Sequence, residues 1–153
     1  MNVSEKLKEL GITWPEQAPK PMANYVTVRR SGNLLFLSGA GPFVDGRPAY
    51  VGRVGKEVSV EEAYEAAKLS VINLLSMIQS ELGSLDNIRI IKLLGFVSSD
   101  PDFFDQPKVI NGASDFLVDL LGENGKHARS AIGTTVLPFN IPVEIEMIAE
   151  IIN

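Results

Sequence analysis

The stretch HARSAIGTTVLPFNIPVEIEMIAEI, residues 127–151, decides the fold because it predicts the last two strands of a sheet. In its second half, alternation sends neighbouring side chains to opposite faces of the strand. One face is apolar and the other is mainly acidic: Val143, Ile145, Met147, Ala149 and Ile151 against Glu144, Glu146, Ile148 and Glu150. We expect helices to cover the apolar face. The mixed face suits either open solvent or a subunit interface, and alternation does not choose between them.

Upstream of this stretch, the sequence predicts a hairpin and then a short β segment. Apolar and β-branched residues favour strands at Tyr25–Arg30 and Leu34–Ser38, with Ser31, Gly32 and Asn33 as the turn between them. The glycine-rich stretch that follows predicts a loop with one or two short strands around Asp45 and Gly46.

Two long helices flank another predicted strand. Ser59 and Glu62 have the spacing of a capping box, and apolar residues then recur at helical spacing as far as Gly83. The stretch 88–99 is β-branched and apolar, which favours a strand, and residues 104–122 return to helical spacing with Gly122 as the stop.

The N-terminal residues predict a peripheral segment. A short helix is expected over Ser4–Leu10, with Ser4 as its cap and Gly11 as its stop, followed by a proline-rich arm. We therefore expect residues 1–24 to form a helix and arm, and residues 25–153 to form a single domain. The element order predicts an α+β sandwich with a mixed β-sheet and two long helices packed on one face.

Composition excludes several classes of function. The chain of 153 residues has no cysteine and one histidine, so thiolate catalysis and cysteine or multi-histidine metal sites are excluded, and we expect a metal-independent protein without a cofactor. No apolar run reaches membrane-spanning length, and the N-terminus lacks the apolar core of a secretory signal, so a cytoplasmic location is expected. The net charge of −5 disfavours nucleic acid as a partner.

Four ordered segments resemble the Rid (YjgF-type, endoribonuclease L-PSP-like) family of reactive-intermediate imine deaminases. They are NYVTVRRSGNLLFLSG, DFFDQPKVINGASDF, the ARS that follows His127, and the LPFNIPVEIE that ends in the acidic strand. The similarity runs from about Tyr25 to the end of the chain. It implies a chorismate-mutase-like (YjgF-type) fold, assembled as a homotrimer with its sites between subunits.

The resemblance also implies a reaction. The family hydrolyses enamines and imines of the 2-aminoacrylate or 2-iminobutyrate type to 2-keto acids and ammonia. Arg129 matches the family's substrate-binding arginine, whose planar fork suits a substrate carboxylate. Glu144 matches the glutamate linked to the attacking water. From the residues alone, Arg129 could instead pair with a neighbouring acid, and Glu144 could simply be solvated.

Four further positions match the family's substrate-binding residues, and three of them have an ordinary alternative. Tyr25 would line the cleft, or else pack in the core or hairpin. Gly39 would allow close approach of the ligand, or else serve as a turn glycine. Asn111 would face the cleft, or else point to solvent. Ala131 would contribute a backbone donor.

Departures from the family pattern concern the substrate. Ala40 replaces a common glutamine, Ala131 a frequent cysteine, and His127 a frequent proline, while the arm before Tyr25 is longer than usual. These differences indicate a divergent subgroup with a reshaped pocket around the arginine and the glutamate, and they leave the physiological substrate open. His127 titrates near neutrality and could act as an acid or base, although a lone loop histidine is often incidental.

Rival functions remain at this stage. Some members of the family are described as endoribonucleases or translation inhibitors, although the acidic charge and the lack of a basic run count against RNA. A non-catalytic protein that binds small carboxylates would use the same arginine. A chorismate mutase activity is a further alternative, for which the expected fold is the only support.

Overall fold

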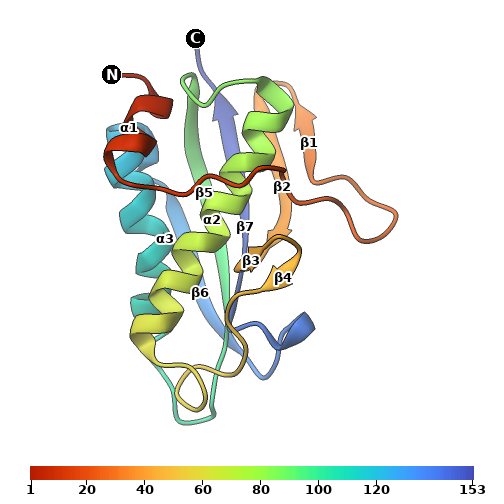
Figure 1. The fold of residues 1–153 in the computed structure, drawn as a ribbon, viewed down its shortest axis with the longest axis vertical. Coiled ribbons are helices and arrows are strands. Elements are labelled where there is room, and N and C mark those ends of the chain that lie inside the picture. Colours follow the sequence, from red (N-terminus) through yellow and green to blue (C-terminus); the bar gives the residue numbers. More distant parts are fainter.

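The computed structural model describes residues 1–153 and shows helices packed on one face of a mixed sheet (Figure 1). The helices are α1 (Val3–Glu9), α2 (Val60–Leu82), α3 (Gln106–Leu121) and the short η1 (Gly122–Gly125) and η2 (Pro138–Asn140). The strands are β1 (Val28–Ser31), β2 (Leu34–Ala40), β3 (Phe43–Val44), β4 (Arg47–Pro48), β5 (Ile88–Ser98), β6 (Ala128–Thr134) and β7 (Val143–Ile151). This confirms the predicted α+β class and element order.

The main sheet has the strand order β1-β2-β7-β5-β6. Only β5 and β6 run parallel, and α3 provides the crossover between them. The other neighbours are antiparallel, and β3 and β4 form the small separate hairpin expected around Asp45 and Gly46. Strand β7, which is last in the chain, therefore lies at the centre of the sheet, whereas β6 is an edge strand.

Both long helices cover the same face of the sheet, as Figure 1 shows. The side chain of Ser59 accepts a hydrogen bond from the Glu62 backbone and that of Glu62 accepts one from the Ser59 backbone, so the predicted capping box is present. Gly83 ends α2 in the left-handed conformation, with φ of 83°, which glycine adopts without steric cost. The predicted start and stop of α2 are thus confirmed, and Gly122 ends α3 as predicted, although α3 begins at Gln106 and not at residue 104.

Alternation along β7 is also confirmed. Its apolar residues from Val143 to Ala149 are buried against the helices, whereas Glu144 is half-buried and Glu146 is exposed on the face without helices. We call this second surface the open face. It also carries Phe36 and Ile132, whose exposed fractions are 43% and 45%. The open face is therefore partly apolar and partly charged, and no other part of the chain covers it.

The predicted starts of β1 and α1 are wrong. Strand β1 begins at Val28 and not at Tyr25, because the chain bends at residues 22–25, where the Tyr25 amide bonds to the Ala23 carbonyl. Helix α1 is capped by Asn2 and not by Ser4. Asn2 has Glu5 three residues on and forms a complete capping box with it, which places Ser4 inside the first turn.

The chain between α1 and β1 crosses the outer side of α2 (Figure 1). It leaves α1 beside α3 and passes over α2 to reach the hairpin at the opposite edge of the sheet. Trp14 and Ile12 pack against the hydrophobic core at the start of this arm. None of the helices combines the length and hydropathy that a membrane span requires.

Candidate functional site

Arg129 lies on edge strand β6 and points toward α3. It pairs with Leu93, a fully buried residue, and neighbouring residues of a parallel pair place their side chains on the same face. Its Nη1 donates to Ser114 Oγ at 3.1 Å and its Nη2 donates to the Pro107 carbonyl at 3.3 Å. None of the four ion pairs in the structure includes Arg129, so it does not pair with a neighbouring acid.

Two other predicted site residues lie on the same side of the sheet as Arg129. Asn111 lies between Pro107 and Ser114 on α3, and positions four and seven residues apart share one helix face. Ala131 is two residues further along β6, so it faces the same side as Arg129 and packs against the core. We refer to Arg129, Ala131, Asn111 and Ser114 as the arginine face.

Glu144 lies on the open face, opposite Phe96 of β5. Burial raises the pKa of its carboxyl, and the negative charge of Glu146 raises that pKa further. Neither a hydrogen bond nor an ion pair within the chain holds the carboxylate. A half-buried carboxylate with a raised pKa and no fixed partner is suited to accept a proton from water.

Gly39 lies directly beneath this carboxylate. A methyl group added at Gly39 would come within 2.7 Å of Glu144 Oε2. Gly39 also sits where the register between β2 and β7 shifts, between Leu37 and Ala40. The Glu144 side chain therefore occupies the space beside the Gly39 backbone, and Gly39 lies within β2 and not in a turn. Close approach of a ligand to Gly39 stays a prediction.

Tyr25 lies near the same end of β2. The hydroxyl of Ser38 donates to the Val26 carbonyl, and the Ser38 amide donates to the Thr27 carbonyl, which places the residues after Tyr25 beside Ser38 and Gly39. Tyr25 has an exposed fraction of 46%, and its hydroxyl oxygen accepts a hydrogen bond from the Met22 amide at 3.3 Å. Packing in the core is therefore excluded. We refer to Glu144, Gly39 and Tyr25 as the glutamate face.

The arginine face and the glutamate face lie on opposite sides of the sheet. Arg129 is on the side that the helices cover, whereas Glu144 is on the open face. One chain places Arg129, Asn111 and Ala131 on one side of the sheet and Glu144 beside Gly39 on the other, with the segment after Tyr25 next to Ser38. It does not bring the two groups into contact with each other.

Ser114 is a residue of the site that the sequence did not indicate. Its hydroxyl lies 2.9 Å from His127 Nε2 and also accepts the hydrogen bond from Arg129. Helical spacing could have indicated Ser114, because it lies three residues after Asn111 and therefore on the same face of α3, the face that meets β6.

His127 is hydrogen-bonded within this group. Its Nδ1 lies 2.7 Å from the Gly125 carbonyl, and its Nε2 meets Ser114. Burial lowers the pKa of His127, the positive charge of Arg129 lowers it further, and the bond to Gly125 opposes both effects. The ring is therefore neutral near pH 7.

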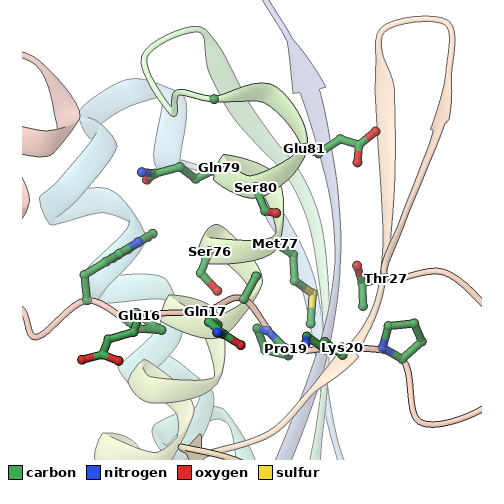
Figure 2. Close-up of a pocket in the computed structure, with 15 residues that line it drawn as sticks. Glu16, Gln17, Pro19, Lys20, Thr27, Ser76, Met77, Gln79, Ser80 and Glu81 are labelled. Atoms are coloured by element: carbon green, nitrogen blue, oxygen red, sulfur yellow. The ribbon is translucent and has the colours of Figure 1, made fainter.

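A cavity of about 760 Å³ lies elsewhere, under the N-terminal arm. Figure 2 shows Glu16, Gln17, Pro19 and Lys20 of the arm lying across Ser76, Met77, Gln79 and Ser80 of α2. None of the six predicted site residues lines this cavity. It lies between the arm and α2 and extends to Thr27, just before β1, and no residue of the arginine face or the glutamate face lines it.

Comparisons with known proteins agree with the resemblance. The family model described as "YjgF/chorismate_mutase-like, putative endoribonuclease" matches residues 4–151. Protein TCP17 of Trypanosoma cruzi is 39% identical over 99% of this chain and 95% of its own length. The mitochondrial protein MMF1 of Saccharomyces cerevisiae is 30% identical over 86% of this chain and 78% of its own length.

A solved structure gives the same result for the fold. The crystal structure of Atu1372 from Agrobacterium tumefaciens, a protein of unknown function, is 48% identical with a TM-score of 0.90, covering 97% of this chain and 92% of that one. The fold is therefore the YjgF-type, chorismate-mutase-like α+β fold that the sequence predicts. From the family match and these relatives together, the chain belongs to the YjgF/RidA (endoribonuclease L-PSP) family.

Proposed function

We propose that the protein hydrolyses reactive enamine and imine metabolites of the 2-aminoacrylate or 2-iminobutyrate type to 2-keto acids and ammonia. The observation that carries this proposal is the environment of the Arg129 side chain. Its guanidinium is partly buried, is held by two hydrogen bonds to α3 and has no acidic partner. A partly buried guanidinium without an acidic partner favours binding of an anion, because the carboxylate of a substrate would supply the negative charge that no residue of the chain supplies.

The geometry of the guanidinium suits that role. Two of the five N–H groups of Arg129 are used by Ser114 and Pro107, so three remain for a carboxylate. A planar fork can make two parallel hydrogen bonds to one carboxylate, which fixes both the position and the orientation of a small substrate. Asn111, one turn from each anchoring position on α3, would donate a further hydrogen bond to the substrate.

Hydrolysis then needs only an oriented water and a proton acceptor. The enamine tautomer takes up a proton at carbon to give an iminium, and Glu144 accepts a proton as water attacks the iminium carbon. The resulting carbinolamine loses ammonia, and the carbon–nitrogen bond is replaced by the carbonyl of the 2-keto acid. The substrate already reacts with water, so holding it and orienting the water account for the rate. None of these steps needs a metal.

The proposal includes a homotrimer in which the arginine face of one subunit meets the glutamate face of its neighbour. Two observations support it: Arg129 and Glu144 lie on opposite sides of one sheet, and the open face exposes apolar side chains such as Phe36 and Ile132. Apolar groups on an uncovered sheet face favour association. The complete site would then contain Arg129, Asn111 and Ala131 from one chain and Glu144, Gly39 and Tyr25 from the next.

The deciding experiment generates an imine in the presence of the purified protein. An amino-acid oxidase or a threonine dehydratase supplies 2-imino acids, and semicarbazide traps those that have not yet been hydrolysed. We expect the protein to lower semicarbazone formation and to speed release of ammonia. Unchanged trapping across several imino acids would show that the protein is not an imine deaminase, and bound 2-oxobutyrate without turnover would favour the metabolite-binding alternative.

Two further measurements test the remaining alternatives. RNA cleavage that survives rigorous purification and is lost in Arg129→Ala would favour the endoribonuclease alternative, which the net charge of −5 disfavours. Sedimentation velocity should give a trimer. A stable monomer with full activity would contradict the site between subunits.

A further inference from the structure

A continuous line of hydrogen bonds runs from the loop before β6 to the guanidinium of Arg129. It begins at the Gly125 carbonyl, passes through both nitrogens of His127 and the hydroxyl of Ser114, and ends at Arg129 Nη1. The three distances are 2.7, 2.9 and 3.1 Å. Each group in this line therefore contacts the next at hydrogen-bonding distance.

The chemistry of the end groups determines the direction of every bond. A carbonyl can only accept, so the hydrogen of the neutral imidazole is on Nδ1, facing Gly125. Nε2 is then an acceptor, and the Ser114 hydroxyl donates to it. The lone pairs of Ser114 Oγ are left to accept from Arg129. All four groups are satisfied in one arrangement, which fixes the tautomer of the ring.

The surrounding charges keep His127 neutral in this arrangement. Arg129 on β6 repels a second positive charge, and burial opposes charging as well. On η1 and the loop after it, Lys126 and Glu123 form an ion pair with each other at 2.9 Å. On α3, the carboxylate of Asp115 accepts a hydrogen bond from Tyr64. No carboxylate is paired with the imidazole.

We propose that Ser114 and His127 are positioning residues that hold the Arg129 guanidinium in the orientation that receives the substrate carboxylate. This inference rests on the proposed function. An unrestrained arginine side chain has many rotamers, and fixing it before the ligand arrives removes that entropic cost from binding. Ser114 is not assigned as a nucleophile, because its oxygen already accepts a hydrogen bond from a cation, which lowers its reactivity toward carbon.

The kinetic test compares Ser114→Ala and His127→Ala with a carboxylate-bearing imine as the substrate. We expect KM to rise about tenfold while kcat falls less than threefold, because the arginine remains but is no longer oriented. Ser114→Thr keeps the hydroxyl and should restore a KM within about threefold of the unaltered protein. Lys126→Ala, an exposed neighbour of His127, is the matched control and should leave KM unchanged. Circular dichroism and sedimentation confirm that each variant is folded and assembled.

A spectroscopic test does not depend on turnover. His127 is the only histidine, so its ring nitrogens give one unambiguous pair of NMR signals. We expect the Nδ1–H tautomer near pH 7, and a higher His127 pKa in Arg129→Met, because the positive charge that lowers it is gone. An Nε2–H tautomer would overturn the assigned direction of the bonds.

The outcomes separate the two proposals. An active protein whose Ser114→Ala and His127→Ala variants keep the original KM would overturn the positioning role but leave the deaminase intact. If no imine is hydrolysed, the deaminase fails, and calorimetric titration with 2-oxobutyrate decides the positioning role: weaker binding in both variants supports it and unchanged binding overturns it. Covalent capture of Ser114 by a sulfonyl fluoride, seen by mass spectrometry, would also overturn it.

Discussion

The arginine face and the glutamate face differ in how their charged groups are held. Arg129 is tied to α3 by two hydrogen bonds and is backed by Ser114 and His127. Glu144 has no comparable hydrogen bond, and only the absence of a side chain at Gly39 makes room for it. The cation is thus oriented within one chain, whereas the carboxylate is left without a partner.

This difference indicates separate roles for the two charged groups in the proposed site. A group that binds a fixed part of every substrate benefits from being held in place before binding. A group that exchanges protons benefits from a raised pKa, which an ion pair would lower. The arginine face therefore has the properties of a binding element and the glutamate face those of a proton acceptor.

Removing the arginine should have the largest effect. A hydrogen bond to a charged partner contributes about 1.5–3 kcal/mol, so losing two in Arg129→Ala should lower kcat/KM by about 10²–10⁴-fold. The measurement is steady-state hydrolysis of a 2-imino acid, with sedimentation to show that the oligomer is unchanged. Arg47→Ala removes an exposed arginine of β4 and should have no effect. Retained activity in Arg129→Ala would show that another group binds the carboxylate.

Neutralising the proton acceptor should have the next largest effect. Glu144→Gln keeps the shape but cannot accept a proton, so kcat should fall about 100-fold with KM nearly unchanged. If kcat is unaffected and KM rises, Glu144 is a binding residue and the comparison between the two faces is wrong.

Glu146→Gln is the matched control for Glu144→Gln, and it also tests the cause of the raised Glu144 pKa. Glu146 is exposed on the same face, and its charge raises the Glu144 pKa. Activity requires ionised Glu144, so it falls as the pH drops through that pKa. Glu146→Gln should leave the maximal kcat unchanged and move this acidic limb to lower pH, which a profile of kcat/KM against pH measures.

Gly39→Ala should have a moderate effect through displacement of the carboxylate. The added methyl group would lie 2.7 Å from Glu144 Oε2, so that side chain must move. The moving atoms are the end of a flexible side chain, so we expect a roughly tenfold lower kcat with a thermal midpoint close to that of the unaltered protein. A large loss of thermal stability instead would show that Gly39 serves the fold and not the site.

The smallest expected effect is on stability. A carboxyl whose pKa is raised on folding destabilises the folded state when it is ionised, so stability is lost as pH rises from the unfolded pKa through the folded one. Glu144→Gln removes this penalty. Its thermal midpoint should exceed that of the unaltered protein at pH 7, and the difference should vanish below about pH 4. A midpoint that is lower at pH 7 would contradict the raised pKa.

Local patterns predicted much of the fold. The capping box at Ser59 and Glu62, the glycine stops and the alternation along β7 each depend on residues close together in the chain, and each is confirmed. The start of β1 was wrong because strand pairing depends on distant residues, and the bend at Tyr25 is set by the arm before it. The predicted cap of α1 was wrong because Asn2, with Glu5 three residues on, can form a capping box, whereas Ser4, with Leu7 at that spacing, cannot.

The site was predictable in its residue types and not in its arrangement. Arg129 and Glu144 stand out by resemblance, yet which side of the sheet each one faces depends on register across three strands, β6, β5 and β7. The connection between His127 and Ser114 depends on how α3 packs against β6, which no spacing within the sequence reports. The sequence therefore predicted the residue types of the site, but not the features that depend on pairing and packing between elements far apart in the chain.

The central position of β7 has a consequence for synthesis of the protein on the ribosome. Leu34 pairs with Glu150, and Ile88 pairs with Ile151, so the sheet cannot close until β7 has emerged. Until then, the hairpin of β1 and β2 and the strand β5 each have an unpaired edge next to apolar residues, a state that is prone to aggregation. Emergence of β7, more than that of any earlier strand, should therefore govern when these edges become paired.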